Sequence, residues 1–177
     1  MKLWDKNNTT DDLVEAFTVG QDRALDLLLA PYDALASIAH VMMLDEVGLL
    51  DKAEAKSIVK ELQQIYKDAI AGRFVIEDGS EDVHSQIELL LTRILGETGK
   101  KVHAGRSRND QVLVALKLFY RHEIEEIVKR TKMLFDELMS LSEKHKHDLM
   151  PGYTHMQVAM VSSFGLWFGA YAESLAD

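Results

Sequence analysis

The chain has 177 residues, 47% of them hydrophobic, and a formal net charge of −9. A chain of roughly this length buries about two-thirds of its unfolded surface, so the composition predicts a folded domain and excludes a disordered or collagen-like chain. The negative charge opposes general binding to nucleic acid or anionic membranes, and the absence of cysteine excludes disulfides and thiolate metal sites.

No stretch of the sequence resembles a secretion signal or a membrane anchor. The start turns polar directly after Leu3 and Trp4, without the apolar core of a signal peptide. The longest uncharged run, 156–172, is shorter than the roughly 20 apolar residues of a membrane span. We therefore expect a cytoplasmic protein.

Apolar residues recur at helical spacing along nearly the whole chain, and no segment alternates convincingly with period two, which predicts an all-α fold. After a polar lead-in at 7–12, Pro31 suits the first turn of a helix that stops at Gly48. The apolar face expected for this helix consists of Leu35, Ile38, Met42 and Val47.

Two further helices are expected before residue 96. Asp51 and Glu54 have the spacing of a capping box, and the helix that they begin should end near Gly72. Ser80 is expected to cap the next helix. The predicted packing faces are Ile58, Leu62, Ile65 and Ala69 in the first of these helices, and Ile87, Leu90, Leu91 and Ile94 in the second.

The glycine-containing segment 96–106 predicts a loop, and the segment 108–145, which lacks proline and glycine, predicts one very long helix. At 1.5 Å per residue this helix is on the order of 55 Å long, so its apolar seams must be buried against other long helices. The seams consist of Val112, Leu116, Phe119, Ile124, Ile127, Leu134, Leu138 and Leu141.

Pro151 and Gly152 end the long helix, and a last helix is expected from about His155 to the end of the sequence. Because that helix is apolar on nearly all sides, it predicts either a tight oligomer or a truncated protein. We expect an N-terminal helical domain at 1–107 and the first long helices of a helix bundle at 108–177.

A basic cluster at 100–111 is the most unusual feature of the sequence. It places His103, Ser107, Arg108 and Asn109 at a loop-to-helix junction, where free backbone N–H groups and the helix dipole favour an anion. Guanidinium groups bind carboxylates bidentately, so the cluster suits a substrate with several carboxylates. A helix cap with exposed arginines is the alternative interpretation.

A second candidate is the pair Thr154 and His155, which follows the Pro151-Gly152 turn. An imidazole in this place can exchange a proton at neutral pH, although a structural histidine beside a turn is the alternative.

Metal and cofactor sites are not predicted. Glu81 and His84 have the spacing of a di-iron ligand pair, but the chain has no second Glu-x-x-His. Asp82 and His84 are candidates for a polar network near the basic cluster instead, with helix capping as the alternative. The tract 145–147 is interpreted as solvated surface. No phosphate-binding or dinucleotide-binding glycine motif is present.

Two segments together resemble the N-terminal part of the argininosuccinate lyase family, within the fumarase/aspartase superfamily. The stretch 102–112, Val-His-Ala-Gly-Arg-Ser-Arg-Asn-Asp-Gln-Val, resembles the family's His-Thr-Gly-Arg-Ser-Arg-Asn-Asp-Gln-Val signature. The stretch 151–157, Pro-Gly-Tyr-Thr-His-Met-Gln, resembles its Pro-Gly-Tyr-Thr-His-Leu-Gln block. Their order and separation fit as well, so the resemblance covers essentially the whole chain.

The resemblance implies a role for each matching residue. Arg108 and Asn109 would contact substrate carboxylates with Ser107 beside them, and Thr154 and His155 would face the succinyl portion, where His155 assists proton transfer. Thr18 and Asp22 match a Ser and an Asp that hold the amino-acid end of the arginine moiety. The supporting residues are Asp82, His84, His103 and Gln157.

The implied reaction is the reversible β-elimination of argininosuccinate to arginine and fumarate, without a cofactor or a metal, in a homotetramer whose subunits share active sites. The family's Gly-Ser-Ser loop, which carries the serine regarded as the base, has no counterpart in these residues, so the chain alone is expected to be inactive. The alternatives are a crystallin-like structural protein on the same scaffold and a related lyase that releases fumarate from another substrate.

Three smaller departures from the family pattern are visible. Ala104 stands where Thr is usual, the segment 158–161 replaces Arg-Ala-Gln-Pro, and Asp5-Lys6 replaces Gly-Gly.

Overall fold

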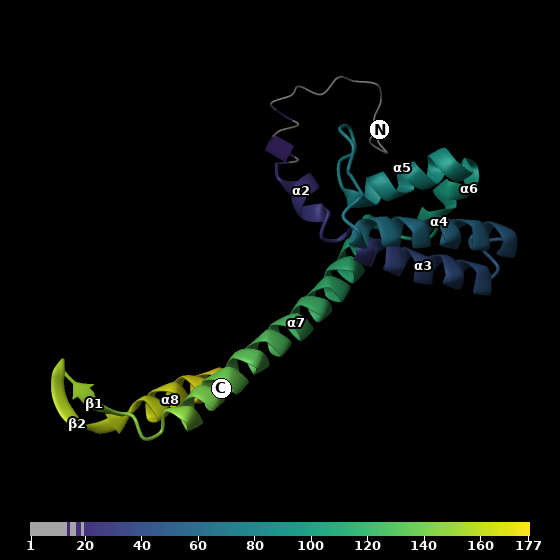
Figure 1. Cartoon of the computed structure of the whole chain (residues 1–177). Coiled ribbons are helices and arrows are strands. Elements are labelled where there is room, and N and C mark those ends of the chain that lie inside the picture. The colour runs from purple at the N-terminus through teal and green to yellow at the C-terminus, as the bar shows by residue number, and fades with distance from the viewer. Residues whose placement is uncertain (1–13, 15–16, 19) are drawn as a thin grey trace. The chain divides into compact units, whose positions relative to one another are not determined.

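A computed structural model describes residues 14, 17–18 and 20–177 (Figure 1). The predicted polar lead-in at 7–12 and the residues Leu3, Trp4, Asp5 and Lys6 lie outside the described residues. The described part of the chain is mostly helical, which confirms the all-α fold class apart from one small sheet.

The chain divides into two compact units, Met1–Tyr120 and Arg121–Asp177. The long helix α7 (Arg108–Lys144) begins in the first unit and ends in the second. The predicted domain division at 107/108 stays a prediction.

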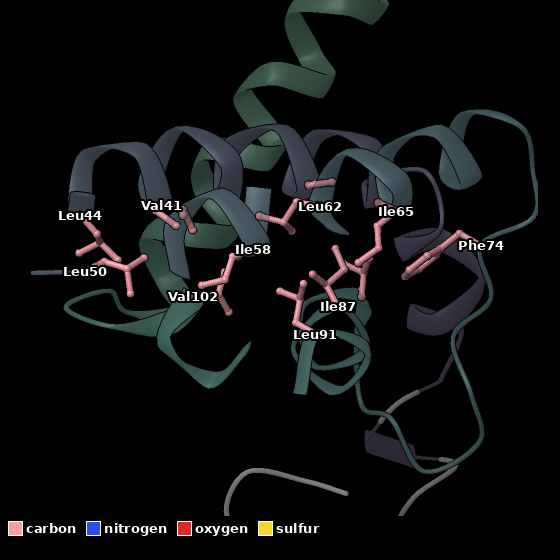
Figure 2. Close-up of a cluster of buried hydrophobic side chains, with 14 of the residues drawn as sticks. Val41, Leu44, Leu50, Ile58, Leu62, Ile65, Phe74, Ile87, Leu91 and Val102 are labelled. Carbon is pink, nitrogen blue, oxygen red and sulfur yellow. The ribbon is translucent and has the colours of Figure 1, made fainter. Parts of the chain in front are cut away.

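The first unit contains α2 (Asp22–Asp26), α3 (Ala30–Glu46), α4 (Lys52–Ile70), α5 (Val83–Leu95), the short helices α6 (Glu97–Lys100) and η1 (Lys101–His103), and the start of α7. Helices α3 and α4 lie side by side (Figure 1). Figure 2 shows the core that these two helices form with α5 and η1, which combines Val41 and Leu44 of α3, Ile58, Leu62 and Ile65 of α4, Ile87 and Leu91 of α5, and Val102 of η1.

The predicted helix limits in this unit are largely confirmed. Pro31 lies in the first turn of α3, and Gly48 follows its end with a φ of 75°. Asp51 caps α4 by accepting a hydrogen bond from the Ala53 backbone N–H at 3.1 Å, and Gly72 follows the end of α4 with a φ of 68°. Of the apolar face predicted for α4, Ile58, Leu62 and Ile65 are buried as expected and Ala69 is partly buried.

Other details of the first unit differ from the predictions. The cap of α5 is Asp82, which accepts from the Ser85 backbone N–H at 2.6 Å, whereas the Ser80 hydroxyl donates to Gln86. The segment predicted as a loop at 96–106 contains α6 and η1. Ile94, expected in the packing face of α5, is 57% exposed.

The buried face of α3 is not the predicted one. Leu35, Met42 and Val47 are exposed, and α3 buries Ala30, Asp33, Ala34, Ser37, Val41 and Leu44. The prediction was wrong because α3 carries apolar residues on more than one side, and the face with Asp33 and Ser37 is the one that other polar groups cover.

The second unit contains the end of α7, a two-stranded antiparallel sheet of β1 (Leu149–Thr154) and β2 (Gln157–Ser163), and α8 (Phe164–Ala176). The prediction of a helix from about His155 was therefore wrong. Val158 and Val161 are β-branched and favour a strand, and a helix begins only at α8, where the Ser163 hydroxyl accepts from the Leu166 backbone N–H at 3.1 Å.

Apolar side chains of the second unit are largely exposed in this chain. They include Ile124, Ile127 and Leu134 of α7, Val158 and Val161 of β2, and Leu166 and Tyr171 of α8. Among residues 14, 17–18 and 20–177, no helix combines the length and the apolar character that a membrane crossing requires.

Candidate active site

The N-terminus of α7 carries the central residues of the basic cluster. The Ser107 hydroxyl accepts a hydrogen bond from the Asn109 backbone N–H at 3.2 Å, and the Gln111 backbone N–H donates to the Ser107 carbonyl at 3.3 Å. Ser107 therefore acts as the helix cap, and Arg108 is the first helical residue. Ser107 and Asn109 are both exposed at this positive end of the helix dipole.

The Arg108 guanidinium is held from three sides. Nη2 donates to the Ser85 hydroxyl at 3.2 Å, and Nη1 donates to Gln111 Oε1 at 3.4 Å. Nε lies 3.7 Å from Asp82 Oδ2. Since the side chain keeps 29% of its surface exposed, the guanidinium is both fixed and open to an anion.

Behind Arg108 lies a buried polar group that we name the Asp33 cluster. It consists of Asp33, Ser37, His84, Arg106 and Gln111. Gln111 Nε2 donates to both Asp33 oxygens, at 2.9 and 3.0 Å, and the Ser37 hydroxyl donates to Asp33 Oδ1 at 3.3 Å. His84 Nδ1 lies 2.9 Å from Asp33 Oδ2, but off the line of a well-aligned hydrogen bond. Arg106 Nη2 donates to the Ser37 hydroxyl at 3.1 Å.

The Asp33 cluster keeps a carboxylate ionised in the protein interior. Burial raises the pKa of the Asp33 carboxyl, but the His84 imidazole, the Gln111 amide and the Arg106 guanidinium outweigh it and hold the pKa below its ordinary value. Burial also lowers the pKa of the Arg106 guanidinium, whereas the nearby carboxylates of Asp33 and Asp110 raise it. The cluster therefore joins α3, α5 and the start of α7 by charged contacts as well as by apolar packing.

The predicted residues Thr154, His155 and Gln157 lie at the tip of the β1–β2 hairpin. Thr154 pairs with Gln157 across a two-residue turn, and the two turn residues, His155 and Met156, have φ values of 50° and 60°. A turn of this kind is usually built with glycine or asparagine, so the His155 backbone is held in a strained conformation. All four side chains are exposed in this chain.

The structure brings Asp82, His84 and Arg108 together, and it brings Thr154, His155 and Gln157 together in the other unit. His103 ends η1, close in sequence to α7. Thr18 donates its hydroxyl to the Val14 carbonyl at 2.8 Å, and Asp22 is the first residue of α2. Asp33 and Ser85 were not predicted, and the signal for Asp33 is a charged residue four positions before Ser37 in the largely apolar first half of α3.

Within the described residues, no group of three or more His, Asp or Glu side chains lies together as a metal site would require. His84, the second residue of the Glu81–His84 pair, lies against Asp33.

Comparison with known proteins shows which family the chain is similar to. A model of the lyase family matches residues 5–177. The chain is 60% identical to an argininosuccinate lyase of Parabacteroides distasonis over 99% of the chain and 40% of that protein. It is 42% identical to the argininosuccinate lyase of Thermotoga neapolitana over 99% of the chain and 44% of that protein. The chain thus spans about 40% of the length of such curated relatives.

Solved structures have the same fold. An EDDS lyase variant with bound fumarate superimposes with a TM-score of 0.73 at 27% identity, over 96% of this chain and 33% of that one. A fumarate lyase:delta crystallin from Brucella melitensis, at 18% identity, gives a TM-score of 0.70 over 93% of this chain and 41% of that one. The family model covers nearly all of the sequence, both motifs included, and the chain therefore belongs to the lyase family.

Proposed function

We propose that the protein is an argininosuccinate lyase, which splits argininosuccinate reversibly into arginine and fumarate. The observation that carries the proposal is the 57–60% identity to argininosuccinate lyases of several species, because it extends over 99% of the chain and includes both motifs. The open, fixed guanidinium of Arg108 at a helix N-terminus supports it, since the substrate carries carboxylates.

In the proposed reaction a base removes a proton from the carbon next to a carboxylate, and an acid protonates the departing guanidine. Negative charge that develops on the carboxylate is stabilised by Arg108 and by the backbone N–H groups at the start of α7. Asn109 and Ser107 bind beside Arg108, and Thr154 and His155 face the succinyl portion, where His155 assists proton transfer or orients the group that performs it.

The remaining roles complete the proposed site. Thr18 and Asp22 hold the amino-acid end of the arginine moiety, and an Asp carboxylate suits its ammonium group. Asp82, His84, His103 and Gln157 support the binding residues. The protein would act in the cytoplasm as a homotetramer, without cofactor or metal. A partner subunit would cover the exposed apolar residues of α7 and α8.

The test is fumarate release from argininosuccinate by the full-length polypeptide that contains these 177 residues. Arg108→Ala should lower kcat/KM roughly ten- to a hundredfold, the effect of a lost charge-assisted hydrogen bond. His155→Asn should lower kcat roughly a hundredfold or more, as expected for a group that takes part in proton transfer.

Arg130→Ala is the matched control, because it removes an exposed arginine of α7 outside the basic cluster and should leave the rate unchanged. Full activity in both site variants would remove the residue assignment. Fumarate release from other N-succinyl compounds, but not from argininosuccinate, would favour a related lyase, and no release from any of them would favour a structural protein.

A further inference from the structure

The Asp33 carboxylate is fully buried in the first turns of α3, yet it contacts groups from two other helices that border Arg108. Gln111 of α7 donates to both of its oxygens, and His84 of α5 lies against Oδ2. Neither Asp33 nor its hydrogen bonds reach the surface, so this residue cannot touch a substrate itself.

The contact with Asp33 decides which way the Gln111 carboxamide faces. An ionised carboxylate only accepts hydrogen bonds, so Gln111 must turn its NH₂ group toward Asp33. The other end of the same amide, Oε1, then faces Arg108 Nη1 at 3.4 Å. In the opposite orientation an NH₂ group would face the guanidinium, and two donors would oppose each other.

A second connection runs through the start of α5. His84, which lies against Asp33, is followed directly by Ser85, whose hydroxyl accepts from Arg108 Nη2 at 3.2 Å. All three groups that hold the guanidinium therefore lie on, or cap, helices that Asp33 joins. The low pKa of Asp33 is consistent with a permanent negative charge in this place.

We propose that Asp33 is a positioning residue for the reaction: it orients the Gln111 carboxamide so that Oε1 accepts from Arg108 and the guanidinium is held ready for a substrate carboxylate. The inference rests on the proposed function for its effect on the substrate. The orientation of the carboxamide itself can be tested without any activity.

The kinetic test compares Asp33→Asn, Gln111→Glu and the double variant in the full-length polypeptide. Asp33→Asn keeps the volume but lets the Gln111 amide face either way, so KM for argininosuccinate should rise roughly tenfold with a smaller change in kcat. Gln111→Glu alone places two carboxylates against each other in the interior, so it should raise KM more than Asp33→Asn does. In the double variant the new amide at position 33 donates to the new carboxylate at position 111. The second oxygen of that carboxylate accepts from Arg108, so KM should return most of the way to the wild-type value.

Asp26→Asn is the matched control. Asp26 is a half-buried carboxylate that accepts from the Val83 backbone N–H at 3.1 Å, at the same end of α5, and it has no described contact with Gln111 or Arg108. Its KM should equal that of the wild type. A purely structural role for Asp33 predicts an unchanged KM in folded Asp33→Asn and no recovery in the double variant, and either result would overturn the proposal.

The second readout is the ¹⁵N side-chain NMR signal of Gln111 in the 177-residue chain, assigned by its loss in Gln111→Glu. We expect slow exchange of this NH₂ group in the wild type and in Asp26→Asn, and faster exchange in Asp33→Asn. An unchanged signal in Asp33→Asn would contradict the orientation by Asp33. If the wild type releases no fumarate, the proposed function fails, and the NMR result alone decides whether Asp33 orients Gln111.

Discussion

The Ser142 hydroxyl of α7 donates a hydrogen bond to the Gly165 carbonyl of α8 at 2.7 Å. The two backbones are in close contact at this point, because a Cβ added at Gly165 would lie 2.5 Å from the Lys146 Cα and 2.6 Å from the Ser142 carbonyl oxygen. The absence of a side chain at Gly165 thus lets α8 pack directly against the end of α7.

Gly165→Ala should lower the free energy of unfolding by about 1–3 kcal/mol, the usual cost of forcing a group into a filled site. The matched control is Gly169→Ala, whose Cβ would meet only the movable Ser142 hydroxyl, at 3.3 Å. That change should be neutral or stabilising by up to about 1 kcal/mol through helix propensity. Urea unfolding measures both, and equal effects of the two substitutions would contradict the close packing at Gly165.

Asp82→Ala should reduce both stability and the binding of carboxylate ligands. It removes the cap of α5, which costs about 0.5–2 kcal/mol, and also the acidic group that faces Arg108 Nε. Asp51→Ala removes the equivalent cap of α4 without touching Arg108, so it should lower stability alone. Thermal unfolding and a KM measurement separate the two effects. A normal KM in Asp82→Ala would show that Asp82 only caps the helix.

His40 should make the stability depend on pH. Burial lowers the pKa of His40 from 6.5, and Arg106 and His103 lower it further. The Ala104 carbonyl, 2.9 Å from Nε2, and the Asp110 carboxylate raise this pKa but do not outweigh the burial. Below pH 6.5 the unfolded chain therefore binds a proton before the folded chain does, so the free energy of unfolding falls with decreasing pH until the folded pKa is reached.

Urea unfolding between pH 5 and 8, a range chosen to bracket an ordinary histidine pKa of about 6.5, measures this slope. In His40→Gln, which cannot titrate but can still donate to Ala104, the slope should be smaller. His147→Gln, at an exposed position, should retain the slope of the wild type. Identical slopes in all three proteins would show that His40 is not the group responsible.

Met156→Gly should stabilise the β1–β2 hairpin. Met156 is 98% exposed and has a φ of 60°, so glycine relieves strain and loses almost no packing. We expect a net gain of about 0.5–1 kcal/mol after the greater freedom of glycine in the unfolded chain is counted. Ala159→Gly, in β2, has no such strain to relieve and should be destabilising. Chemical unfolding of the second unit checks both, and a loss of stability in Met156→Gly would contradict a strained turn.

Helices with a single apolar face could be predicted well from the sequence. The face of α4 and the limits of α3, α4 and α7 follow from local periodicity and from Pro31, Gly48 and Asp51, which act through their own backbone geometry. The hairpin was missed because its turn, His155-Met156, lacks the glycine or asparagine that marks such turns in a sequence.

The residues of the candidate site likewise divide into those that the local sequence indicates and those that only the folded chain brings together. Arg108 and His155 could be proposed from the sequence because they lie in motifs whose residues are adjacent in the chain. Asp33 could not be found in this way, since its partners His84 and Gln111 lie far along the sequence and meet it only when α3, α5 and α7 pack.

The sequence by itself therefore determined the helical character of the chain, its main helix limits and the concentration of cationic and N–H donor groups at the start of α7, because these depend on residues within a few positions of one another. Only the tertiary structure decided which face of α3 is buried, that 149–163 forms a sheet, and that a buried carboxylate contacts the groups around Arg108. Those outcomes depend on which distant side chains can satisfy one another's charge and hydrogen bonds once water is excluded.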